Sequence, residues 1–158
     1  MSQAIENRLD NAYVIADCMV KVGGQNVSND LMDKIMLVEV QQNLYLPAMF
    51  TIHIYSPDLE LFETNPFNMG AEVSIFMSQD TSSQKIMVGE VTTVEIDADV
   101  GTPLLIIRGY DRLHRLQRGR KTRTFAQVKD SDLVTKLAIE GALTASVAST
   151  SGLYDYIL

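Results

Sequence analysis

The sequence contains no tryptophan, two histidines and a single cysteine among its 158 residues. The lone Cys18 excludes a disulfide within the chain and any zinc site that needs two thiolates of this chain. No window approaches 18 uncharged apolar residues, so the sequence predicts no transmembrane helix. Residues 1–10 include Glu6, Arg8 and Asp10 and no apolar run, unlike a secretory signal or transit peptide. If the protein leaves a cell, we expect it to do so without a cleavable signal.

The composition is that of a chain that folds into one domain. Hydrophobic residues make up 46% of the sequence and charged residues 21%. These proportions are typical of globular proteins, and they exclude a disordered or collagen-like chain. With 158 residues the chain is long enough to bury a compact core.

Charge is distributed unevenly along the chain. The 20 acidic and 13 basic residues give a net charge of −7, yet residues 1–107 hold 15 acidic and four basic residues, and residues 108–123 hold one acidic and seven basic residues. A basic segment on an acidic body indicates a nucleic-acid contact, a phosphate site, or docking on an acidic face such as that of a neighbouring copy. A solvated face without a partner is the alternative that these counts leave open.

The first two thirds of the chain alternate apolar and polar residues, which is typical of half-buried β-strands. Gly23 and Gly24 separate two short runs of this kind and predict a hairpin, because glycine reaches positive φ without steric cost. We expect the first strand of this hairpin to begin near Tyr13.

Further strands follow the hairpin. Residues 36–41, 50–55 and 73–77 alternate in the same way, and the pattern places Met36 on the apolar face of the first of them. Residues 86–96 and 103–110 flank a polar turn and predict a long antiparallel hairpin.

The alternation ends at Asp111, where a short helix is expected. Residues 111–118 predict one or two helical turns ended by Gly119. Leu113 and Leu116 share one face of this helix, and we expect both to be buried under the sheet.

The remaining chain predicts a strand, a helix and a second strand. Residues 120–125 favour an edge strand, and Asp130 and Asp132 favour an N-cap and acidic first turn of a helix that ends at Gly141. Residues 153–158 begin a new strand whose ladder partners we expect outside this sequence. The elements together predict a mainly β fold with α insertions (α+β), a barrel or a sandwich.

Few residues suggest catalysis or metal binding. His53, His114 and Cys18 do not form a nucleophile–base pattern, and the arginines around His114 disfavour its protonation. Asp97 and Asp99 are more typical of turn chemistry than of a metal site. The hairpin glycines are not a phosphate loop, because neither Lys-Ser/Thr nor a helix follows them. We therefore expect no enzyme activity, no cofactor and no metal.

A linked set of motifs resembles the signature of the phage late-control protein D and valine-glycine-repeat spike family. The resemblance runs from about residue 12 to the end of the sequence. Its opening is most similar to the branch found in extracellular contractile injection particles. The motifs that carry it are Gly70 with Val73, Gly89-Glu90-Val91, Arg108-Gly109-Tyr110-Asp111-Arg112-Leu113-His114-Arg115-Leu116, Arg118-Gly119-Arg120-Lys121-Thr122-Arg123-Thr124-Phe125, Asp130-Ser131-Asp132-Leu133-Val134 and Tyr154-Asp155-Tyr156-Ile157-Leu158.

The resemblance implies a structural role at the tip of a contractile tail. Members of this family form trimeric hubs in which each subunit supplies two tube-like barrels, so that a three-fold spike docks on a six-fold inner tube. For this chain it implies an antiparallel tube-like β-barrel of the phage tail hub type at residues 1–125, a helical insertion and linker at 126–152, and the first strand of a following domain at 153–158. A truncated spike is the favoured interpretation and a split subunit the alternative.

Partners and location follow from the same resemblance. The expected partners are two further copies in a homotrimer, the inner tube ring, baseplate proteins and a spike tip protein, with neither nucleic acid nor stable membrane insertion. Assembly is expected in the bacterial cytoplasm as part of a tail-like particle, which then acts outside the cell or toward a target cell. The runner-up hypothesis is a small β-rich module that binds nucleic acid or an anionic ligand through its arginines, and an undetected hydrolase is the third.

Two groups of residues are singled out by the motifs. The signature positions expected to have structural roles are Gly89, Gly109, Tyr110, Asp111, Leu113, Leu116, Gly119, Thr122, Phe125 and Asp132. The candidate subunit-interface residues are Arg108, Arg112, Arg115, Arg118, Arg120 and Arg123.

Overall fold

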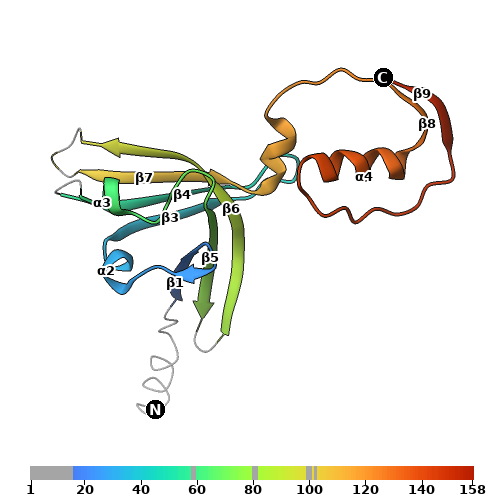
Figure 1. The fold of residues 1–158 in the computed structure, drawn as a ribbon. Helices are drawn as coiled ribbons and strands as arrows, with labels where there is room; N and C mark the ends of the chain where they lie inside the picture. Colours follow the sequence, from blue (N-terminus) through green and yellow to red (C-terminus); the bar gives the residue numbers. More distant parts are fainter. Residues whose placement is uncertain (1–15, 58–59, 80–81, 99–100, 102) are drawn as a thin grey trace, which may run out of the picture.

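The main body of the protein is a curved, seven-stranded antiparallel sheet (Figure 1). The computed structural model describes residues 16–57, 60–79, 82–98, 101 and 103–158. The strand order is β2-β1-β5-β6-β7-β4-β3. The strands are β1 (Ala16–Val22), β2 (Gln25–Asn26), β3 (Ile35–Gln41), β4 (Met49–Tyr55), β5 (Glu72–Gln79), β6 (Ser82–Asp97) and β7 (Leu104–Tyr110).

The sheet confirms the strands that the alternation predicts. Gly23 and Gly24 connect β1 to β2 with φ of 58° and 81°, so the turn uses the left-handed backbone that glycine allows. The long hairpin is formed by β6 and β7. The predicted start of the first strand near Tyr13 lies outside the described residues.

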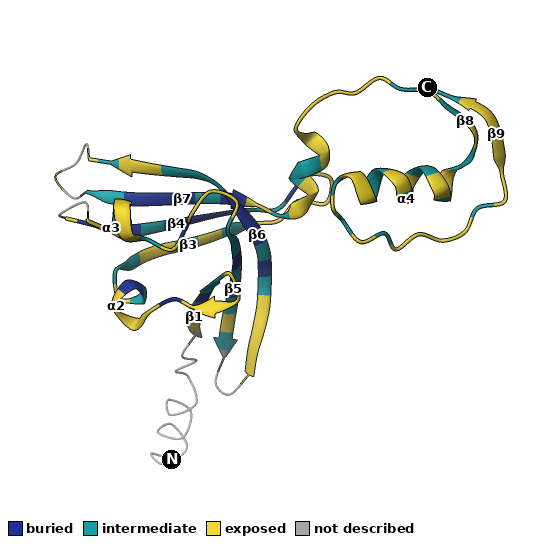
Figure 2. Cartoon of the chain, in the orientation of Figure 1, coloured by how far each residue is buried: buried dark blue, intermediate teal, exposed yellow. Residues whose placement is uncertain are grey.

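One face of the sheet carries the hydrophobic core. The central strands alternate so that Phe50, Ile52 and Ile54 on β4 point inward and are fully buried. Short helices α2 (Asn29–Met32) and α3 (Glu60–Thr64) add Leu31 and Leu61 to this core. The Ser28 hydroxyl accepts a hydrogen bond from the backbone of Leu31 and caps α2. Figure 2 shows that the buried positions concentrate on the strands of the sheet.

The seven described strands form an open sheet, which ends at β2 on one side and β3 on the other. The structure therefore has the mainly antiparallel β fold that was predicted, while no closed barrel is found among the described strands. On β3 the register shifts between Ile35 and Leu37. This irregularity turns Met36 outward, with 64% of its surface exposed, so the prediction that Met36 lies on the apolar face is wrong.

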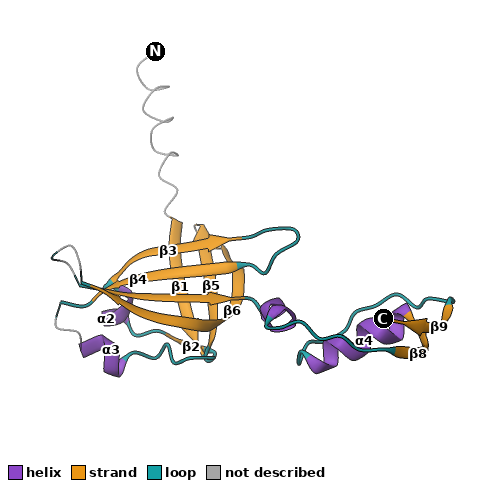
Figure 3. Cartoon of the chain, turned by 90° about the horizontal axis from the view of Figure 1, so that it is seen from above, coloured by secondary structure: helices purple, strands orange, loops and turns teal. Residues whose placement is uncertain are grey.

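Beyond β7 the chain leaves the sheet and forms a separate unit, which we call the C-terminal unit (residues 125–157) (Figures 1 and 3). A 3₁₀ helix, η1 (Arg112–Gln117), leads to β8 (Phe125–Lys129), α4 (Asp130–Glu140) and β9 (Leu153–Ile157). Strands β8 and β9 pair with each other in a two-stranded antiparallel sheet. None of the residues of α4 is buried.

The C-terminal unit corrects three predictions. The edge strand lies at 125–129 and not at 120–125, because Arg123 pairs with Glu140 on α4 and does not join a ladder. The helix ends at Gly141 as predicted, but its N-cap is Lys129, which makes no side-chain capping hydrogen bond. The strand at the end of the sequence has a partner within the chain, since β9 pairs with β8.

Two signature glycines let the central strands approach the Phe50 ring. A Cβ atom at Gly109 would overlap both the Glu90 carbonyl oxygen and the Phe50 ring, and one at Gly89 would lie 2.7 Å from the Tyr110 carbonyl oxygen. Neither backbone can move easily, because β6 and β7 are paired along this region. A side chain at Gly109 therefore has no space.

We expect Gly109→Ala to lower the free energy of unfolding by about 1 to 3 kcal/mol or more, because the added methyl group overpacks the core beside Phe50. Gly119→Ala is the matched control, since nothing lies within 4 Å of a Cβ at that position. Urea denaturation of both variants checks the expectation. Equal stability of the two variants would show that the space around Gly109 can expand without cost.

Candidate functional site

The site is an ion-pair cluster at the end of the sheet from which the C-terminal unit emerges. We call it the arginine junction, and it comprises Glu72, Glu90, Arg112 and Arg115. Glu90 lies on β6 next to the closely packed Gly89, and only 6% of the residue is exposed. The two arginines come from η1, directly after β7.

Arg115 forms a bidentate pair with the buried carboxylate of Glu90. Its Nε donates to Glu90 Oε2 at 3.0 Å, and its Nη2 donates to Oε1. Arg112 completes the cluster, with Nε 3.5 Å from Glu90 Oε1 and Nη2 2.5 Å from Glu72 Oε2. A planar guanidinium that meets a carboxylate through two parallel hydrogen bonds fixes orientation as well as charge.

The same arginine also reaches the end of α4. Arg115 Nη1 donates to the carbonyl oxygens of Gly141 at 3.2 Å and Ala142 at 3.4 Å. Carbonyl groups at the end of a helix lack intrahelical donors, and a cation there is favourable. One side chain thus joins a buried acid of the sheet to the end of the helix in the C-terminal unit.

Asp111 fixes the start of η1 relative to the sheet. Its Oδ1 accepts a hydrogen bond from the backbone of Leu113 at 2.9 Å and caps η1. Its Oδ2 accepts from the Ala48 backbone at 2.9 Å, and the Asp111 backbone N–H donates to the Ala48 carbonyl oxygen at 2.9 Å. Asp111 therefore sets the direction in which Arg112 and Arg115 leave the sheet.

The two leucines of η1 are not buried, which corrects the prediction. Leu113 is 43% exposed and Leu116 is 44% exposed. Because η1 projects beyond the end of the sheet, no core lies beneath its apolar side chains. A Cβ at Gly141 would lie 2.9 Å from Leu116 Cδ2, so Leu116 lies against the C-terminal unit instead.

The other signature positions lie along the path from the sheet to the C-terminal unit. Tyr110 ends β7 with its ring centroid 6.2 Å from that of His114. Gly119 and Thr122 are exposed in the connection to β8, and Asp132 is exposed in the first turn of α4. Phe125 opens β8, and the cations of Lys136 and Arg123 lie 5.2 and 6.0 Å from its ring centre.

Most of the candidate interface arginines have partners within the chain. Besides the arginine junction, Arg108 pairs with Glu95, and Arg123 forms two hydrogen bonds with Glu140 at 2.7 and 2.6 Å. Arg118 donates to His114 Nε2 at 2.7 Å. Among the described residues, Arg120 is exposed and forms no ion pair. Their role in a subunit interface stays a prediction.

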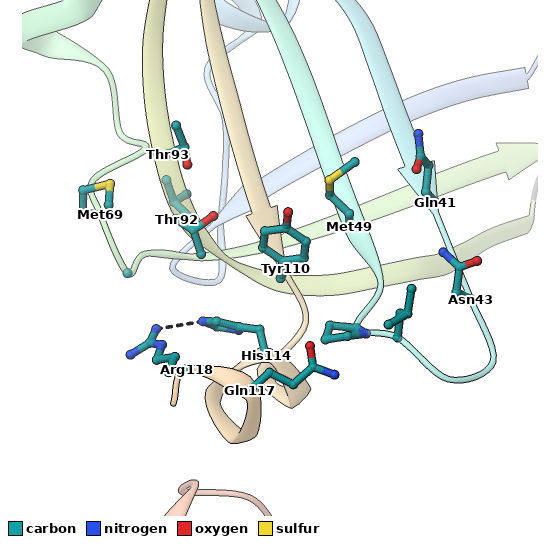
Figure 4. Close-up of a pocket in the computed structure, with 14 residues that line it drawn as sticks. Gln41, Asn43, Met49, Met69, Thr92, Thr93, Tyr110, His114, Gln117 and Arg118 are labelled. Atoms are coloured by element: carbon teal, nitrogen blue, oxygen red, sulfur yellow. Dashed lines mark hydrogen bonds between the residues drawn. The ribbon is translucent and has the colours of Figure 1, made fainter. Parts of the chain in front are cut away.

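A groove of about 980 Å³ lies beside the arginine junction (Figure 4). Its lining includes Tyr110, Met49 and Met69 together with His114 and Arg118, but no carboxylate. His114 Nδ1 lies 2.6 Å from the Asp111 carbonyl oxygen, and His114 Nε2 lies 2.7 Å from Arg118 Nη2. Both ring nitrogens are occupied, and neither is placed to act as a base.

The other residues considered for chemistry are not brought together. His53 lies on β4, far along the chain from the arginine junction, and burial raises the pKa of the Cys18 thiol, with Asp17 adding to the rise. No group of three or more potential metal ligands occurs in the described part of the chain. Asp99 lies outside the described residues, so the Asp97–Asp99 pair is not tested. None of the described helices is long and apolar enough to cross a membrane.

The sequence analysis singled out the arginines of the junction, but it did not predict which carboxylates they pair with. Glu90 occurs in the predicted strand between Gly89 and Val91, and an acid in an apolar strand is the signal that could have identified it. Glu72 and Glu140 carry no such signal, because each is an ordinary polar residue in its local pattern. Their pairing becomes visible only once the fold brings distant segments together.

Comparison with known proteins identifies a family and a fold. The family model described as the Alg8 N-terminal domain matches residues 13–157. The 43 kDa tail protein of prophage MuSo2 from Shewanella oneidensis has a similar structure, with a TM-score of 0.67 at 12% identity over 90% of this chain. A tail protein from Neisseria meningitidis MC58 has a TM-score of 0.51 at 18% identity over 79% of this chain.

These comparisons also show how much of the relatives the chain represents. It spans 43% of the MuSo2 tail protein and 33% of the Neisseria tail protein. No curated protein is significantly similar to the chain in sequence. The structural matches show that the fold of this chain is similar to part of the fold of these two tail proteins.

We expect Arg115→Ala to reduce the free energy of unfolding by about 3 kcal/mol, because it leaves the Glu90 carboxylate buried without its bidentate partner. Arg123→Ala is the control, since its pair with Glu140 is exposed and screened by water, so the loss should be much smaller. Denaturation measures stability, and hydrogen exchange over residues 130–142 reports release of α4. Similar losses in both variants would contradict the importance of the arginine junction.

The pH dependence of stability tests the same pair. Burial alone would raise the pKa of Glu90, but the hydrogen bond and charge of Arg115 outweigh it and hold the pKa below its ordinary value of 4.5. A lowered pKa in the folded state contributes stability above the unfolded-state pKa, and this contribution is lost as pH falls below about 4.5 toward the folded-state pKa.

We expect wild type to be more stable than Glu90→Gln at neutral pH and the difference to shrink as the pH is lowered to about 3. Urea denaturation of the two proteins across this range measures the difference. A difference that stays constant with pH would mean that the Glu90 charge is not what stabilises the arginine junction.

Proposed function

The chain belongs to the Alg8 N-terminal domain family, and from this membership together with its tail-protein fold we propose that it is a non-enzymatic structural subunit of a contractile, phage tail-like particle. The observation that carries the proposal is the structural match to the MuSo2 tail protein, which extends over 90% of this chain. The match extends beyond the sheet. The seven strands of the sheet by themselves account for a smaller share of the chain than the 90% that is matched.

The finer proposal is a trimeric hub of the spike and baseplate, similar to late-control protein D and valine-glycine-repeat spikes. In this proposal three subunits, each with two tube-like barrels, join the three-fold spike to the six-fold inner tube. The chain spans less than half of the tail proteins it resembles, which is consistent with one of two barrels being present here. The open edges at β2 and β3 are sites where further strands can complete a barrel or a ring.

The ion pairs of the basic segment favour a structural role over a ligand-binding role. Arg112, Arg115 and Arg123 each form a salt bridge with a carboxylate of the same chain. A nucleic-acid surface needs cations that are free to contact phosphates. The runner-up hypothesis of an arginine patch for nucleic acid or an anionic ligand is therefore less well supported than docking between proteins.

The proposed partners are two further copies of the subunit, the inner tube ring, baseplate proteins and a spike tip protein. We propose assembly in the bacterial cytoplasm, followed by action outside the cell or toward a target cell. A cofactor, a metal, nucleic acid or stable membrane insertion is not required.

Electron microscopy of the full-length protein with its inner tube protein tests this proposal. We expect a three-fold particle that caps one end of a six-fold tube ring. The tube protein alone is the control and should form uncapped rings or tubes. A full-length protein that stays monomeric and leaves the tube uncapped would contradict the hub proposal.

A further inference from the structure

Two surface features of this chain are complementary in charge, and each also exposes apolar side chains. The first is the acidic knob, formed by Glu60, Phe62 and Glu63 on α3. The second is the basic hollow of about 870 Å³ between the 118–123 segment and α4, with Arg118 and Lys121 at its rim. The acidic knob is separate from the arginine junction, whereas the basic hollow borders it through Arg115.

The acidic knob places an aromatic side chain between two carboxylates. Phe62 is 47% exposed, and Glu60 and Glu63 are exposed beside it. None of the salt bridges in the described part of the chain involves either glutamate. An exposed aromatic side chain flanked by two acidic residues favours binding to an apolar pocket that is bordered by basic residues.

The knob is anchored to the sheet through Leu61. Leu61 is partly buried and packs against the core, whereas the neighbouring Phe62 is exposed. Asn65 Nδ2 donates to the Phe62 carbonyl oxygen at 3.0 Å, and Asn65 Oδ1 accepts from the backbone of buried Phe67 at 2.9 Å. A preorganised anchor loses little conformational entropy on binding.

The basic hollow offers the opposite surface. Its apolar lining comes from η1, β8, α4 and the end of the chain, and the residues are Leu116, Phe125, Leu133, Leu137, Ile157 and Leu158. Arg123 and Glu140 form a salt bridge within the lining, whereas neither Arg118 nor Lys121 forms a salt bridge among the described residues. The charge of Lys121 nevertheless acts on Glu140, so that one carboxylate faces more than one cation. The hollow therefore favours an apolar group accompanied by acids.

The two features cannot meet within one molecule, because α3 and α4 lie at opposite ends of it (Figures 1 and 3). We propose that the acidic knob of one copy docks in the basic hollow of the next copy, with Phe62 entering the apolar lining and Glu60 and Glu63 facing Arg118 and Lys121. The contact is head-to-tail, so repetition gives a closed ring or an open chain. That the ring closes after three copies rests on the proposed trimeric hub. The contact between the knob and the hollow does not depend on that proposal.

Charge reversal on each side tests the contact in the full-length protein. The knob variant is Glu60→Arg with Glu63→Arg, and the hollow variant is Arg118→Glu with Lys121→Glu. Each should weaken self-association in sedimentation equilibrium by about tenfold or more, and the chain that carries all four changes should recover most of it. Asp33→Arg, a reversal of an exposed acid at the end of α2, is the control and should leave association unchanged.

Thermal unfolding of each variant verifies that it is folded. The variant Phe62→Ala leaves every charge in place, and it should also weaken association because it removes the aromatic group. Unchanged association in both reversed variants, or no recovery in the combined variant, would overturn the inference. The hub proposal is judged separately by capping of the tube ring. Reversed variants that associate as wild type does and still cap the tube refute only the docking. A wild type that associates through the knob and never caps the tube refutes only the hub.

Discussion

The pairing of one buried carboxylate with one guanidinium decides how the two parts of this protein are arranged. Glu90 is held inside the end of the sheet by strands that approach closely because glycine occupies positions 89 and 109. A charge in that position is tolerated only with a partner, and Arg115 is the residue that supplies it. Since Arg115 also binds the carbonyl groups of Gly141 and Ala142 directly after α4, the requirement to neutralise Glu90 also helps to determine where the C-terminal unit lies.

The signature motif can be understood from this requirement. Gly109 permits close strand packing, Asp111 caps and directs η1, and Arg115 crosses to the C-terminal unit. These are consecutive steps along one short segment, so each depends on the preceding one for its position. The motif therefore specifies a connection between structural parts and does not need a ligand to explain its residue types.

The sequence predicted the sheet well because each strand has one buried face, and burial of one face imposes a period of two on the residues. It failed where local pattern and tertiary surroundings differ. Leu113 and Leu116 share an apolar face, but the helix that carries them extends past the sheet, so the pattern could not reveal what covers them. The bulge at Met36 and the pairing of β9 with β8 likewise depend on contacts between segments. The ion pairs of the site were hidden for the same reason, since Glu90 and Arg115 are 25 residues apart.

The attachment of the C-terminal unit also has a mechanical meaning. Its helix buries no residue, so little apolar surface resists its displacement. Force applied to the unit reaches the sheet along the covalent connection through residues 118–124 and across the Arg115 guanidinium. In the described part of the chain the other contacts at this joint are few, namely Leu116 against Gly141 and the pair of Arg123 with Glu140. A pull on the C-terminal unit is therefore resisted mainly by polar contacts, which water can replace, and the orientation of the unit depends on a handful of side chains.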